Sequence, residues 1–186
     1  SNVTFPNDIN RDDDDRTQLA EHLIRLITRL MFIWFIRQKD LIPEKLFKPA
    51  ELKKILKSFD PDSPKQDNYY RAILQNLFFA TLNCEIKDRT FANEGDDEEG
   101  RKEHYGIKLL YRYPEEFTCT KDKVIDLFRR VPFLNGGLFE CLDRKKGSNA
   151  RSPVIYQDGF SRNPKRVAHI PNNLFFDDRG LITLFS

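Results

Sequence analysis

The chain has 186 residues, of which 39% are hydrophobic, and a formal net charge of +2. This length suits one domain or one and a half, and the apolar fraction is enough for a core of ordinary size. The small net charge excludes a global electrostatic argument for nucleic-acid binding. Three cysteines without CxxC spacing indicate free, buried thiols in a reducing cytosol, not a disulfide framework or a zinc site. We therefore expect a cytoplasmic protein without a signal peptide or a membrane partner.

Residues 1–15 are polar and predict an extended N-terminal arm, with Asp14 or Asp15 placed to cap the helix that follows. Ser1-Asn2 looks like a residue of an expression tag, and residues 180–186 end the chain inside an apolar run. Both features favour a piece cut from a longer protein.

The strongest helical signal covers residues 19–36, LAEHLIRLITRLMFIWFI. Its first half repeats apolar residues at three- and four-residue spacing, which predicts an amphipathic helix. Residues 30–36 are all apolar, and a helix that is apolar all round must be covered on every side by protein. Charges interrupt the run too often for a membrane span, which needs roughly 20 mostly apolar residues. We expect Arg25 and Arg29 on this central helix to bind neighbouring carboxylates, with phosphate as the alternative.

Further helices are predicted after this one. Short helices are expected at 43–47 and 50–59, and a strong helix from about 67 to 83 is the natural antiparallel partner of the central helix. Residues 84–105 contain an acidic, glycine-bounded run and predict a mobile surface loop. Residues 107–113 fit either a strand or a helix end, and 122–131 a short helix.

The sequence pattern changes from helical to irregular at Pro132. Asn135, Gly136 and Gly137 form a turn between two apolar pairs, and residues 154–156 fit a short strand. We therefore predict a mainly α fold. It has an N-terminal arm at 1–15, a helical bundle at 16–131 built around helices at about 16–38 and 67–83, and an irregular part at 132–186 carrying one or two short strands.

Positive charge gathers in the C-terminal half, where residues 121–170 hold eleven Lys or Arg against five Asp or Glu. Basic residues in flexible sequence can follow a phosphate backbone without reading bases, although an ordinary solvated surface is the plainer interpretation. The candidates for DNA-backbone contact are Arg144, Lys145, Lys146, Arg151, Arg162, Lys165 and Arg166.

A search for catalytic motifs gives one formal match. Asp62 followed by Glu85-Ile86-Lys87 has the pattern of a PD-(D/E)xK nuclease, but a predicted helix separates its two halves. Gly136-Gly137 and the Asn163-Pro164 dipeptide lack the glycine-rich turn and the catalytic tetrad of an adenine methyltransferase. We therefore expect no catalytic, cofactor-binding or metal-binding residues in this chain.

Three stretches together resemble a known family. LITRLMFIWFIRQKDLIPEKLF at 26–47, YYRAILQNLFFATLN at 69–83 and VPFLNGGLFE at 131–140 occur in this order and at this spacing. They resemble the region ahead of the methyltransferase domain in type IIG restriction–modification enzymes and in related large adenine-specific DNA methyltransferases. The resemblance covers roughly residues 20–186, and FLNGGLFE is its most specific part.

The resemblance implies a helical, non-catalytic connector within a larger enzyme. Such enzymes methylate adenine at N6 with S-adenosylmethionine, and where a nuclease domain is present it lies toward the N-terminus and uses Mg²⁺. The implied partners are DNA and the neighbouring nuclease and methyltransferase domains of the same chain. For Asn135, Gly136 and Gly137, which match the family phrase, we favour a tight turn with positive φ over a direct ligand contact.

Two alternatives stay open. The chain could be a stand-alone helical module that binds protein, which a large exposed apolar patch without a basic track beside it would favour. It could also be a metal-dependent nuclease, which requires Asp62, Glu85 and Lys87 to converge in space.

Overall fold

The computed structural model describes residues 3–6, 15–93, 107–134, 136–145 and 154–183. Within these residues the protein is mainly helical, with a single antiparallel pair of short strands, so the prediction of a mainly α protein is confirmed. Most of the predicted acidic loop, Asn135, Lys146 and Arg151 lie outside the described residues.

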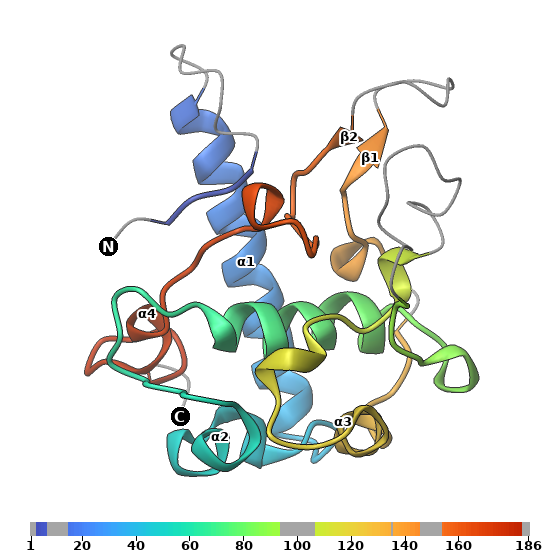
Figure 1. Ribbon diagram of the computed structural model, residues 1–186. Helices are drawn as coiled ribbons and strands as arrows, with labels where there is room; N and C mark the ends of the chain where they lie inside the picture. Colours follow the sequence, from blue (N-terminus) through green and yellow to red (C-terminus); the bar gives the residue numbers. More distant parts are fainter. Residues whose placement is uncertain (1–2, 7–14, 94–106, 135, 146–153, 184–186) are drawn as a thin grey trace.

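Two long helices, α1 and η2, are accompanied along the chain by short helices and irregular segments (Figure 1). They are α1 (Asp15–Arg37), η1 (Glu44–Phe47), α2 (Pro49–Ile55), η2 (Tyr69–Leu82), η3 (Ile86–Asp88), η5 (Ile107–Leu109), η6 (Pro114–Glu116), α3 (Lys121–Phe128), η7 (Gly137–Phe139), β1 (Arg144–Lys145), β2 (Val154–Ile155), η8 (Pro164–Arg166) and α4 (Asn173–Phe176).

The centre of the fold is η2, a π-type helix that is buried along its whole length except at Arg71. Its sequence is apolar nearly all round, so it needs protein on every side. In Figure 1 it runs across α1 instead of alongside it. The predicted antiparallel pairing of the two helices is therefore wrong: a helix that buries every side is covered by several segments, and α1 supplies one of them.

Helix α1 is buried on one side only. Leu26, Leu30 and Ile33 face the core, whereas Ile24, Met31 and Phe35 are exposed. The prediction that the second half of this helix is covered on every side is wrong, because the chain packs elements against one face of α1 and leaves the opposite apolar face open. In the part of the chain that the structure describes, no helix is long and apolar enough to cross a membrane.

The C-terminal half packs on the same core as the helices. Phe175 of α4 lies edge-on to Tyr69, and the Asn172 side chain accepts a hydrogen bond from the Tyr69 N–H and donates to the Asp60 carbonyl. Near the N-terminus, Thr4 pairs with His169 through two backbone hydrogen bonds. One continuous core thus joins the parts predicted at 16–131 and 132–186.

Residues 84–93, predicted as the start of a mobile loop, are held by a buried arginine. The Arg89 guanidinium donates to the carbonyls of Cys84, Thr81, Phe128 and Val131 at 2.9–3.3 Å. Thr81 and Phe128 lie at the C-terminal ends of η2 and α3, where their carbonyls also accept the N–H groups of Cys84 and Val131. Arg89 therefore caps two helices at once, and the loop prediction is wrong for this segment.

Replacing Arg89 with Met should destabilise the fold by about 3 kcal/mol, because it removes four hydrogen bonds and takes from the carbonyls of Cys84 and Val131 their guanidinium donor. The matched control is Arg129→Met, since Arg129 is largely exposed and pairs with Asp126 on the surface of α3. Urea unfolding measures the free energy of unfolding of both variants. A loss of less than about 1 kcal/mol for Arg89→Met would contradict the capping role.

Candidate functional site

The guanidinium of Arg29 joins α1 to two distant loops. It lies 2.8 Å from the Asp158 carboxylate, and both side chains are almost fully buried, at 2% and 3% exposure. Its Nε donates to the Leu138 carbonyl at 2.8 Å and its Nη2 to the Glu140 carbonyl at 2.9 Å. The guanidinium carbon also lies 4.9 Å from the centre of the Phe79 ring, a cation–π distance. The prediction that these two arginines bind carboxylates is confirmed for Arg29. It is not borne out for Arg25, whose Nη1 is buried without a hydrogen-bond partner among the described residues.

Two buried carboxyl groups, those of Asp158 and Asp143, hold the loops around Arg29 through backbone hydrogen bonds. The second oxygen of Asp158 accepts the Leu142 N–H at 2.7 Å, and Asp143 accepts the N–H groups of residues 158, 159 and 160. Burial raises the pKa of Asp143, and the neighbouring Asp158 carboxylate raises this pKa further, while the three N–H groups lower it. Both loops therefore depend on buried carboxyl groups that accept backbone N–H groups.

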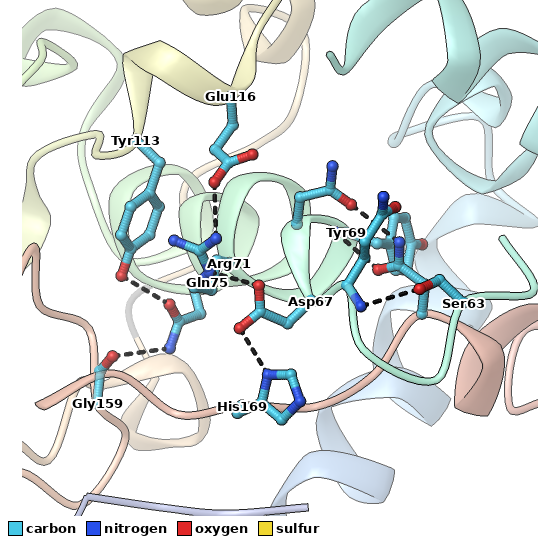
Figure 2. A network of polar contacts seen from close by, with 12 residues as sticks. Ser63, Asp67, Tyr69, Arg71, Gln75, Tyr113, Glu116, Gly159 and His169 are labelled. Atoms are coloured by element: carbon cyan, nitrogen blue, oxygen red, sulfur yellow. Dashed lines mark hydrogen bonds and ion pairs between the residues drawn. The ribbon is translucent and has the colours of Figure 1, made fainter. Parts of the chain in front are cut away.

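A second polar network ties η2 to its neighbours (Figure 2). Arg71 donates to Asp67 at 2.8 Å and to Glu116 at 2.6 Å, and the other Asp67 oxygen lies 2.9 Å from Nδ1 of His169. An Asp–His pair can serve as a general base, but this one links backbone segments: His169 is paired to Thr4 through its main chain. The network fastens η6 and the 167–170 segment to η2.

A hollow of about 620 Å³ lies beside the predicted Gly136–Gly137 turn. Its described lining carries the acidic side chains of Glu85, Asp88 and Glu140, and Lys108, whose ammonium donates to the Cys141 carbonyl at 3.3 Å. Burial raises the pKa of both thiols in its wall, Cys84 and Cys141, so they are poor nucleophiles at neutral pH. All three cysteines are free, as predicted.

The two glycines of this turn do not adopt the predicted backbone. Gly136 is extended, with φ −148° and ψ 138°, and Gly137 begins the 3₁₀ turn η7. The one described glycine with positive φ is Gly159, at +60°. A Cβ at Gly136 or Gly137 would meet nothing within 4 Å. The direction of the chain is set here by η7 and by Arg29, which holds the carbonyls of residues 138 and 140, and not by a left-handed glycine.

The predicted basic cluster is described only in part. Arg162 donates to the Asn93 carbonyl at 2.7 Å, and Arg166 lies over the Tyr156 ring and donates to its hydroxyl at 3.2 Å. Lys165 is exposed on η8. Arg144 and Lys145 form β1, but the structure does not describe their side chains. Lys146 and Arg151 lie outside the described residues. DNA contact by this cluster stays a prediction.

The nuclease pattern does not assemble. Asp62 and Glu85 lie beyond opposite ends of the long helix η2, and Glu85 is paired with Lys87 on the surface at 2.8 Å. The Asp62 main chain is held in a turn by Asp60. Among the described residues no group of three or more His, Cys, Asp or Glu could hold a metal ion. The nuclease alternative is therefore contradicted by the positions of its own residues.

Comparison of the chain with protein-family models, with curated proteins and with solved structures found no match. The role of the site is therefore argued from the positions of its side chains. In the described part of the chain, the buried side chains of Arg29, Asp158 and Arg89 form an ion pair and backbone caps that are suited to holding segments in register, whereas pairs such as Glu85–Lys87 lie on the surface. Sequence reasoning missed Asp143 and Asp158, although Asp143 directly precedes the basic run 144–146 and Asp158 is the one acid between residues 144 and 176.

Two glycine substitutions should behave oppositely. Gly136→Ala should change the free energy of unfolding by less than about 1 kcal/mol, because its backbone suits any residue and its surroundings are open. Gly159→Ala should cost more than about 2 kcal/mol, because φ is positive and the added Cβ would lie 2.4 Å from the Ala168 nitrogen. Thermal and urea unfolding test both, and equal effects would contradict this description of the turn.

Proposed function

We propose that this chain is the helical connector of an adenine-specific DNA methyltransferase of the type IIG restriction–modification kind. One observation supports this: the three stretches that carry the resemblance meet at a single side chain. Arg29 belongs to the first stretch, packs on Phe79 of the second and holds the Leu138 carbonyl of the third. Residues that resemble a family signature are thus used to build a scaffold.

In this proposal the chemistry belongs to neighbouring domains of the same cytoplasmic protein. An adjoining domain would bind S-adenosylmethionine and methylate adenine at N6, and a nuclease domain, where present, would bind Mg²⁺. The connector would hold these domains in register. Its rigidity would come from the buried Arg29–Asp158 pair and the Asp67–Arg71–Glu116 network.

The connector would also contact the DNA backbone through its basic stretch. Arg166 supports this, because its stem and guanidinium are positioned against Tyr156 while Lys165 beside it is exposed. Cations held on a short helix can meet phosphates without reading sequence. The expected contact is therefore independent of base sequence and sensitive to salt.

Duplex DNA binding at low and moderate salt tests the contact. We expect weak binding that falls steeply with salt, and about tenfold weaker binding when Lys145, Lys146, Lys165 and Arg166 are all changed to Ala. The matched control removes four exposed lysines elsewhere, at 39, 45, 53 and 57, and should bind nearly as the parent does. Equal losses in both variants, or no binding at low salt, would contradict a DNA path along this stretch.

A second function is favoured by a separate observation. The open face of α1 is a large apolar patch, and it lies away from Arg29, whose side of the helix meets the loops that lead into the basic stretch. An exposed apolar patch with no basic track beside it is typical of a protein-binding surface. A helical protein-interaction module is therefore the alternative that this structure supports.

A further inference from the structure

The exposed face of α1 has the spacing of a helix-pairing seam. Ile24, Ile27, Met31 and Trp34 follow one another at intervals of three, four and three residues, and each is exposed. This is the alternation with which apolar residues line the contact between two packed helices. The seam runs for about 15 Å along the helix, at 1.5 Å per residue.

The exposed face is apolar except at one residue. From residue 24 to residue 35 every exposed side chain is apolar except Thr28, and the Thr28 hydroxyl donates to the Ile24 carbonyl at 2.8 Å. Thr28 therefore satisfies its polar group within its own helix. Exposed charges stand beyond the two ends of the face, with Glu21 before it and Lys39 and Asp40 after it.

The area of the patch fits a small symmetric contact. The exposed fractions are 65% for Ile24, 40% for Ile27, 55% for Met31, 38% for Phe32, 37% for Trp34 and 55% for Phe35. With roughly 150–200 Å² for each whole side chain, the patch offers on the order of 500 Å². A partner with an equal patch brings the total to about 1,000 Å², the size at which specific interfaces begin.

We propose that this face binds a second copy of the chain, with the two α1 helices antiparallel across a two-fold axis near Met31. A second copy supplies an equal apolar seam, because a two-fold contact uses the same patch on both subunits. The antiparallel arrangement brings Glu21 of each copy toward Lys39 in the turn after α1 of the other copy, whereas a parallel pair would place the two Glu21 carboxylates together. This pairing is independent of the proposed DNA role.

Sedimentation equilibrium from about 1 to 500 µM tests the pairing. We expect a reversible monomer–dimer equilibrium, and a dissociation constant at least tenfold higher for Met31→Glu, which would bury two charges beside the axis. The control is Ile86→Glu, because Ile86 is 56% exposed on η3, away from α1, and should leave the equilibrium unchanged. Unfolding curves check that both variants are folded.

Cysteine cross-linking tests the orientation. Met31→Cys should form a disulfide-linked dimer under mild oxidation, because the two copies of this residue meet at the axis, whereas Ile24→Cys should not. Cross-linking at both positions would indicate a parallel pair and overturn the arrangement. A chain that stays monomeric over the whole concentration range overturns the proposal. It does so even when the same face binds lipid vesicles or another protein.

Discussion

The buried contact between Arg29 and Asp158 is the constraint on which the rest of the arrangement depends. A charged pair this deep has lost its hydration, so it persists only because the guanidinium and the carboxylate are also hydrogen-bonded to backbone groups around them. Those backbone groups belong to loops more than a hundred residues away from α1. The pair therefore converts an irregular C-terminal half into part of the helical core, and the aromatic rings of η2 close over it.

The sequence predicted the local features of this fold well. The helices at α1 and η2 follow from spacing and apolar content, and the carboxylate partner of Arg29 follows from the cost of leaving a guanidinium unpaired. It could not predict which carboxylate binds Arg29, because Asp158 is brought there by tertiary packing. Arg89 was missed for the same reason: its partners are carbonyls, which carry no sequence signal.

The wrong predictions share one physical cause: the apolar content of a helix does not show which of its faces the rest of the chain will cover. The run at 30–36 was expected to be buried all round, yet the molecule covers one face and leaves Met31 and Phe35 open. In η2 a similar content is buried on every side. The glycines of the 135–137 turn mislead in a related way, since glycine permits positive φ without requiring it.

Hydrogen exchange of Arg29→Met, compared with Arg130→Met in the exposed turn after α3, tests most directly whether Arg29 holds the three stretches together. The account predicts that amides of the 138–143 and 156–161 loops lose protection together in Arg29→Met, while α2 keeps its protection, because these loops are anchored through Asp158 and the 138 and 140 carbonyls. Loss confined to α1, with both loops still protected, would contradict it.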